Sequence, residues 1–97
     1  MDLRDVTADT FAPHRGETFR ASAADASPFE LTLVIVTEGA EQGPARRQFS
    51  LVFRSGPGTP HPQRIYRLEH DVLGTREIFL VPIAPDTDGQ RYEAVFT

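Results

Sequence analysis

The sequence predicts an all-β protein, a small six-stranded and mostly antiparallel barrel or sandwich with one short helical turn near its start. Apolar residues recur with a period of two, as they do in half-buried strands. Segments rich in glycine, proline and aspartate interrupt these runs about every ten to fifteen residues, as turns between short strands do. With 97 residues, 39% of them hydrophobic, the chain can form one core, and residues 1–97 are expected to be a single β domain.

The chain is expected to begin with a helical turn followed by a weak strand. Thr7 is a candidate helix cap, and Ala8–Phe11 would form the turn. The last residue of this turn, a phenylalanine, would plug one end of the barrel. Only Phe19 and Ala21 anchor the first strand, which is expected over Glu17–Ala23.

Five further strands are expected after this one. Phe29–Thr37, in its second half, and Ile78–Ile83 are apolar on both faces, which is typical of central strands covered on both sides. Phe49–Arg54, Ile65–His70 and Tyr92–Phe96 alternate between apolar and polar residues, which predicts strands with one buried face.

The clearest hairpin is expected to turn through Asp71–Gly74, with Gly74 supplying a positive φ. This register would place Glu69 opposite Arg76, an ion pair across the two strands. Pro82 has no amide hydrogen, so the strand that contains it is expected to bulge or to leave the sheet at that point.

The inward-facing positions of these elements are expected to form the hydrophobic core. They are mostly large aliphatic and aromatic residues, whose burial is the main source of stability. The predicted core consists of Phe11, Phe19, Leu31, Leu33, Ile35, Phe49, Leu51, Phe53, Tyr66, Leu68, Phe79, Val81, Tyr92, Ala94 and Phe96.

The composition excludes several classes of function. The net charge is −4, whereas a nucleic-acid-binding domain normally carries a basic surface. The chain has no cysteine, which rules out disulfides, thiolate metal sites and cysteine nucleophiles. No apolar run has the length of a membrane helix or the features of a signal peptide. We therefore expect no nucleic-acid partner, no membrane insertion and a cytoplasmic location.

One alternative for the function is binding of a small molecule or a carbohydrate. In this hypothesis the mouth of the barrel would hold the ligand near His14, Tyr66, His70 and Tyr92. These side chains combine apolar surface with hydrogen-bonding groups, as the walls of ligand sites do.

A second alternative is a small hydrolase or metal-dependent enzyme that uses His70 and Glu93. His14 and Glu69 would join them in a metal cluster, but the sequence has no H-x-H, H-x-E or H-E-x-x-H pair. Asp86–Gly89 resembles part of a calcium loop, yet two of the required ligand positions carry alanine and valine, which favours a hairpin turn. We therefore expect no catalytic residue, no metal and no cofactor.

Segments spread over nearly the whole chain are similar to the DUF6916-type family of small bacterial proteins. The resemblance implies a single small domain without a catalytic motif. Because relatives tend to be encoded near phage-tail-like proteins with a tail-collar domain, it also implies an accessory role in a tail-like or fibre-like assembly, inside the cell or in a released or surface form. The similar segments are His14–Phe19 (HRGETF), Phe49–Arg54 (FSLVFR), Tyr66–His70 (YRLEH), Leu73-Gly74, Ile78–Pro85 (IFLVPIAP) and Arg91–Phe96 (RYEAVF).

The favoured function is therefore a non-enzymatic structural or protein-interaction module that binds a protein partner or a second copy of itself. A compact β domain without an active site acts through its surfaces, and an open strand edge is a common docking site. The last strand is the expected edge, with Gln90, Tyr92, Val95 and Phe96 as the contact residues.

Overall fold

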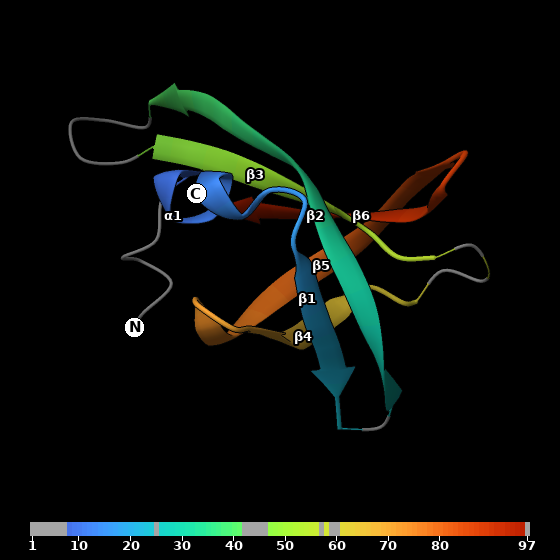
Figure 1. Ribbon diagram of the computed structural model, residues 1–97. Coiled ribbons are helices and arrows are strands. Elements are labelled where there is room, and N and C mark those ends of the chain that lie inside the picture. The colour runs from blue at the N-terminus through green and yellow to red at the C-terminus, as the bar shows by residue number, and fades with distance from the viewer. Residues whose placement is uncertain (1–7, 25, 42–46, 57, 59–60, 97) are drawn as a thin grey trace.

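The computed structural model describes residues 8–24, 26–41, 47–56, 58 and 61–96, and it folds them into a closed β-barrel (Figure 1). A short helix α1 (Ala8–Phe11) runs directly into a 3₁₀ turn η2 (Ala12–His14) ahead of the strands. The predicted cap, Thr7, lies outside the described residues. The strands are β1 (Thr18–Ala23), β2 (Ala26–Glu41), β3 (Arg47–Arg54), β4 (Arg64–His70), β5 (Gly74–Asp86) and β6 (Gly89–Phe96).

The strand order around the barrel is β1-β2-β3-β6-β5-β4, and β4 pairs with β1 to close the ring. Each neighbouring pair is antiparallel. The predicted all-β fold of six antiparallel strands with a short helical turn at its start is therefore confirmed. Its closure depends on contacts between distant parts of the sequence, since β1 pairs with β4 and β3 pairs with β6.

The last strand is not an open edge, so that part of the predicted docking mode is wrong. β6 pairs with β3 from Phe49↔Phe96 to Arg54↔Arg91, and with β5 from Val81↔Glu93 to Asp86↔Gly89. The four residues expected at an edge therefore lie in a strand with neighbours on both sides. Tyr92 is fully buried, and the side chains of Gln90, Val95 and Phe96 lie at different positions along the barrel wall.

A bulge in β2 changes which of its residues face the core. Leu33 pairs with Phe53 and Ile35 pairs with Val52, so two residues of β2 advance the pairing by only one residue of β3. Because side chains alternate between the faces of a strand, such a bulge reverses the alternation beyond it. The prediction that Ile35 belongs to the core is wrong: its side chain is 42% exposed, and Val36 packs against the core instead.

The β4–β5 hairpin is one residue out of the predicted register. His70 pairs with Gly74, so the turn contains three residues, and Gly74 has the expected positive φ of 77°. Arg76 therefore lies opposite Leu68 and is buried, whereas Glu69 lies opposite Thr75. The predicted ion pair between Glu69 and Arg76 is wrong for this reason.

The same shift exchanges the two faces of β5. Ile78 and Leu80 are buried in the core, whereas Phe79 is 51% exposed and Val81 is only half-buried. The prediction of Phe79 and Val81 as core residues is therefore wrong, and β5 is covered on one face only. Pro82 lies beyond the end of the β4 pairing, which stops at Leu80, so its missing amide hydrogen costs no bond on that side.

The rest of the predicted core is confirmed, and the helical turn closes one end of it. Phe11 is completely buried, and its ring lies 6.1 Å from that of Phe49 and 6.0 Å from that of Phe96. Phe96 itself is only partly buried against the core. Buried as predicted are Phe11, Phe19, Leu31, Leu33, Phe49, Leu51, Phe53, Tyr66, Leu68, Tyr92 and Ala94.

Candidate functional site

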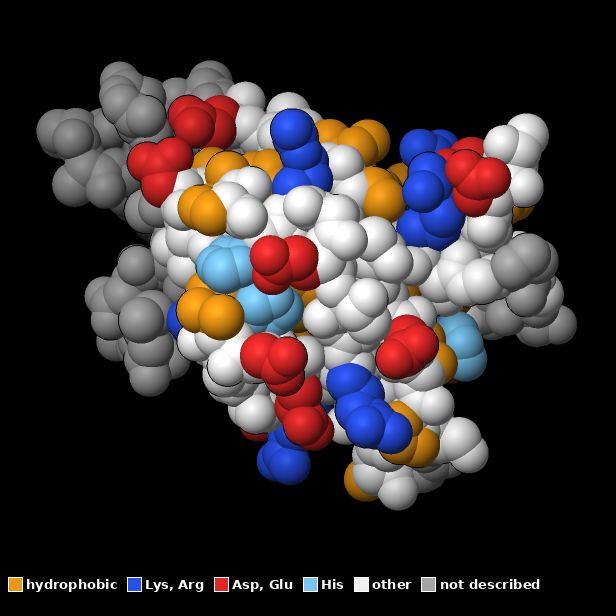
Figure 2. Space-filling model, viewed as in Figure 1, with side chains coloured by type: hydrophobic (Ala, Val, Ile, Leu, Met, Phe, Trp, Pro, Cys, Tyr) orange, Lys and Arg blue, Asp and Glu red, His pale blue; other side chains and the backbone are white. Residues whose placement is uncertain are grey.

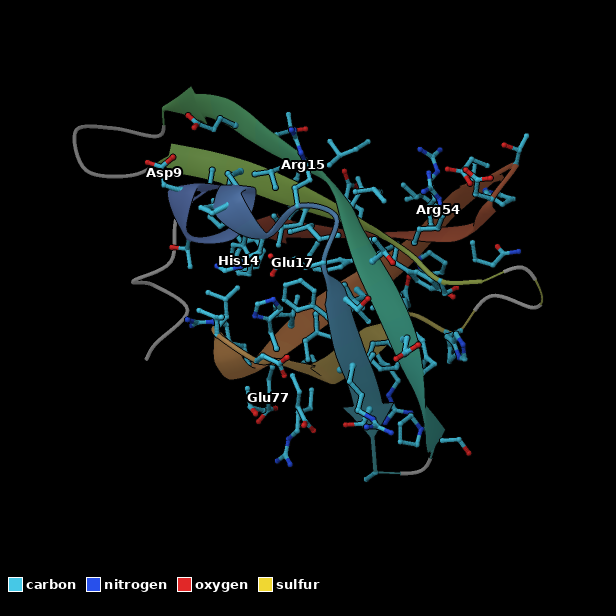
Figure 3. All side chains as sticks on the ribbon, in the orientation of Figure 1. Asp9, His14, Arg15, Glu17, Arg54 and Glu77 are labelled. Carbon is cyan, nitrogen blue, oxygen red and sulfur yellow. The ribbon has the colours of Figure 1, made fainter. Side chains whose placement is uncertain are left out.

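Two histidines and a glutamate meet near the start of β1. The Oε1 atom of Glu17 lies 2.9 Å from Nδ1 of His14 and 2.7 Å from Nε2 of His70. The two imidazole rings are 4.7 Å apart in an edge-on arrangement. His14 and Glu17 lie next to each other where η2 leads into β1 (Figure 3), and paired histidines with acidic neighbours are visible on this face of the surface (Figure 2). We call these three residues the His–Glu–His cluster.

The backbone positions the glutamate of this cluster from both sides. The N–H of Glu17 donates to the carbonyl of His14, and the carbonyl of Glu17 accepts from the N–H of Leu33 on β2. Gly16, with a φ of 89°, makes the bend between η2 and β1. The pairing of β1 with β4 then carries His70 to the same end of the barrel.

The hydrogen bonds of His70 determine where its proton lies. Its Nδ1 atom accepts from the backbone N–H groups of Val72 and Leu73, both at 3.1 Å, in the turn that follows β4. An atom that accepts hydrogen bonds has no proton, so the neutral ring carries its hydrogen on Nε2 and donates it to Glu17. Nδ1 of His14 donates to the same carboxylate oxygen, which leaves Nε2 of His14 with the lone pair.

This arrangement is unfavourable for a metal ion. The three candidate ligand atoms lie within 4.8 Å of one another, which is close enough for a shared cation. A metal on Nε2 of His70 would, however, need the lone pair of an atom that now bears the proton. The proton would have to move to Nδ1, and the ring would lose both hydrogen bonds to the turn. The cluster is better described as a hydrogen-bonded clasp between the start of β1 and the β4–β5 turn.

The pKa of Glu17 is lowered, first by the hydrogen bond from His14 and then by the one from His70. A carboxylate whose pKa is lower in the folded state contributes stability that is fully present above its ordinary pKa of 4.5 and is lost as the pH falls through the lowered value. We expect Glu17→Gln to be less stable than the natural chain at neutral pH, with a difference that shrinks in acid. Denaturant unfolding across a pH series measures this difference.

The control for this measurement is Glu77→Gln, which removes an exposed carboxylate from β5, away from the cluster. We expect it to show little change at either end of the pH range. A stability difference for Glu17→Gln that stays constant down to the acid limb would contradict the proposed role of the carboxylate.

The structure divides the predicted ligand site between two places. His14 and His70 belong to the His–Glu–His cluster, whereas Tyr66 and Tyr92 are fully buried. Tyr66 and His70 are four residues apart along β4, a separation of about 13 Å. Sequence reasoning missed Glu17, although it lies three residues after His14, a spacing at which side chains of a tight turn can meet.

The two tyrosines form a second group with Phe29 and His61. The Phe29 and His61 rings stack at 3.6 Å, and Phe29 also contacts Tyr66 edge-on at 5.4 Å. The Tyr66 hydroxyl donates to the carbonyl of Pro62 at 2.6 Å, and the Tyr92 hydroxyl accepts from the N–H of His61 at 2.9 Å. Both hydroxyls thus hold the segment before β4 against the barrel.

The metal-enzyme alternative places two carboxylates beside His14 and His70, and neither of them lies there. Tyr92 and Ala94 point into the core, so Glu93 between them faces outward. Glu69 is exposed and lies beside Arg20 of β1 in the pairing of the two strands. Neither carboxylate joins His70, whose partner is Glu17.

The calcium-like segment is a hairpin turn, as the sequence predicts. Oδ1 of Asp86 accepts from the N–H groups of Asp88 and Gly89 at 2.9 and 3.1 Å. The same carboxylate forms a two-pronged ion pair with the Arg54 guanidinium, which lies near the β5–β6 hairpin (Figure 3). Arg54, followed by the backbone N–H of Asp88, lowers the pKa of Asp86.

The outer wall of the barrel carries apolar side chains on five neighbouring strands, with Arg91 and Glu93 of β6 among them. Residues that lie directly opposite each other on neighbouring strands share a face. Glu93 faces outward, and its partners Val52 and Val81 therefore do so too. We call the whole set the outer apolar face. It consists of Ile35 on β2, Val52 on β3, Val95 on β6, Phe79, Val81 and Ile83 on β5, and Ile65 on β4.

Four residues of the outer apolar face are accessible, whereas Val81 and Ile83 are half-buried and Val52 is only 8% exposed. The exposed fractions are 42% for Ile35, 57% for Ile65, 51% for Phe79 and 54% for Val95. A shallow surface pocket of about 410 Å³ borders it at Ile65. The pocket is lined by Ser22, Ala23, Ala24, Arg64, Ile65, Arg67 and Glu77.

The fold and the surface define the chain as a small closed antiparallel barrel whose apolar residues serve both a core and an outer wall. The family model described as "Domain of unknown function (DUF6916)" matches residues 6–96, and the chain belongs to that family. Neither the curated proteins nor the solved structures give a significant match. Within the described ranges, no helix has the length and apolar character that crossing a membrane requires.

Proposed function

We propose that the protein is a non-enzymatic interaction module that assembles with a protein partner or with a second copy of itself through its outer apolar face, as an accessory component of a tail-like or fibre-like assembly. The observation that carries the proposal is the composition of β5. Phe79, Val81 and Ile83 face outward, while Ile78 and Leu80 fill the core on the other side of the same strand.

A strand that is apolar on both faces is typical of a sheet covered on both sides. The barrel interior covers one face of β5, and a partner protein would cover the other. Exposed apolar side chains that adjoin over several strands are typical of protein-binding surfaces, whereas isolated ones are common on any surface. The outer apolar face extends over β2, β3, β6, β5 and β4.

The chemistry of the His–Glu–His cluster also supports a role without catalysis. The Glu17 carboxylate and Nε2 of His70 satisfy each other, and Nδ1 of His70 is committed to the turn. The side chain of His70 is only 5% exposed. These bonds give the cluster a structural use, which is to tie β1 to the β4–β5 turn.

We expect Phe79→Asp to abolish assembly with the partner and to leave the barrel folded. Phe79 is half exposed and lies near the middle of the outer apolar face, so a charge there would have to be desolvated on binding. The measurement is co-elution of the purified chain with a tail-collar protein of the kind encoded near its relatives, with circular dichroism as the check on folding.

Thr18→Asp provides the matched control, because it places the same charge on the exposed surface of β1, across the barrel from β6. It should leave the complex intact. If the natural chain forms no complex through this face with the tail-collar protein, with a second copy of itself or with any other protein, the proposed function fails.

A further inference from the structure

We propose that the occupant of the outer apolar face is a second copy of this chain, related by a two-fold axis that crosses β6 between Arg91 and Glu93. This inference rests on the proposed function and names the partner of the same face. It is carried by the order of charges and apolar residues on β6 and β5.

Arg91 and Glu93 are neighbours on the outward side of β6. They are two residues apart, and Tyr92 between them points into the core. Their side chains therefore leave the same face of the strand about 7 Å apart. One is positive and the other negative, and both stand within the apolar surroundings of Val52, Val81 and Ile83.

This order of charges is complementary to itself when the strand is reversed. A two-fold axis that lies in the plane of the interface, perpendicular to β6 and midway between the two charges, places Glu93 of one copy opposite Arg91 of the other. The opposite pairing forms at the same time, so two ion pairs connect the copies.

The same axis brings together the apolar residues of β5. Val81 lies beside Glu93 and Ile83 lies beside Arg91 in the β5–β6 pairing. The axis that pairs the charges therefore places Val81 of one copy near Ile83 of the other. The ion pairs and the apolar contacts thus require the same orientation of the two copies. Such agreement fixes the register of a specific interface.

The remaining charges nearby do not disturb this arrangement. Arg54 lies opposite Arg91 in the β3–β6 pairing, but its guanidinium is bound to Asp86 of the same chain. Nε of Arg91 donates to the carbonyl of Ala84 at 2.9 Å, which holds its guanidinium close to β5. Within the described part of the chain, Glu93 forms no ion pair. In the proposed dimer, Arg91 of the second copy pairs with it.

The test uses charge reversal in the purified full chain, with its association state measured by sedimentation velocity. We expect the natural chain to be a dimer. Glu93→Arg places arginines opposite each other across the axis, and Arg91→Glu does the same with glutamates. Each variant alone should dissociate roughly 100-fold more readily, because like charges across an interface repel.

An equimolar mixture of the two variants provides the decisive measurement. Both arginines of the Glu93→Arg variant then face glutamates of the Arg91→Glu variant, so a heterodimer should form although neither variant dimerises alone. Arg20→Glu, which makes the same change of charge on β1, is the control and should remain dimeric. Circular dichroism verifies that every variant is folded.

Two results would overturn the inference. A natural chain that remains a monomer up to high concentration excludes the second copy, while the proposed function still stands if Phe79→Asp abolishes co-elution with the tail-collar protein. Variants that dimerise alone as well as the natural chain does would place the contact elsewhere on the molecule. The failure of this inference can thus be distinguished from the failure of the proposed function.

Discussion

Phe11→Ala is expected to destabilise the folded barrel by about 3–5 kcal/mol. The ring is completely buried and contacts the rings of both Phe49 and Phe96. Its removal leaves a cavity at the end of the barrel, where the strands are held together by the plug that α1 inserts. Small domains have about 5–15 kcal/mol of stability in total, so a large part of it would be lost.

Thermal or denaturant unfolding, followed by circular dichroism at concentrations that keep the chain monomeric, measures this effect. We expect the Tm to fall by more than about 10 °C. Phe79→Ala is the matched control, since it removes the same atoms from a half-exposed ring and should cost about 1 kcal/mol or less. If both variants lost a similar amount of stability, burial of Phe11 by α1 would not be what holds this end of the barrel together.

Gly89→Ala is expected to have the second-largest effect, about 2–4 kcal/mol. Gly89 begins β6 with a φ of 153°, a conformation that residues with a side chain rarely adopt. A Cβ atom at this position would overlap the carbonyl oxygen of Ser55 and lie 3.0 Å from the carbonyl carbon of Gly56. Both atoms belong to the backbone, and this segment is held in place because the N–H of Ser55 donates to the carbonyl of Gln90 at 2.8 Å.

The segment after β3 therefore has to move, or the β5–β6 hairpin has to open, to accommodate the methyl group. Gly56→Ala is the control, because a Cβ atom there meets nothing within 4 Å although the residue lies in the same segment. In denaturant unfolding, the free energies of unfolding of the two variants should differ by the energy that the clash at residue 89 costs. Equal stabilities would contradict the close approach of Gly89 to Ser55.

The strands and turns of the fold could be predicted from the sequence because their determinants are local, whereas closure of the ring depends on the distant pairings of β1 with β4 and of β3 with β6. Alternating apolar residues define β1, β3, β4 and β6, and turn residues mark the ends of the strands. What could not be predicted is the phase of two strands. A single bulge after Leu33 reverses the faces of β2, and a turn shorter by one residue after His70 reverses those of β5. In an apolar run such as Ile78–Ile83 both phases bury hydrophobic residues, so the pattern alone does not choose between them.

The candidate sites could be predicted only in part, because strand pairing and strand phase also decide which side chains come together. His14 and His70 lie close together because they occupy the same end of the barrel. Both are candidate site residues on the basis of their residue type alone. Glu17 was missed because a lone exposed glutamate at the start of a strand carries no signal until β1 and β4 are paired. The outer apolar face was missed because the wrong phase of β5 assigned Phe79 and Val81 to the core.

The order of the strands has a consequence for how the chain folds as it is synthesised. The β2–β3 and β4–β5 hairpins form from neighbouring residues, but the ring closes only when β3 pairs with β6, which places Phe49 opposite Phe96. Contacts so far apart in sequence slow folding, and no stable ring can form until residue 96 has left the ribosome. Until then the two hairpins present unpaired strand edges and uncovered apolar faces, so the unfinished chain is expected to aggregate more readily than the closed barrel.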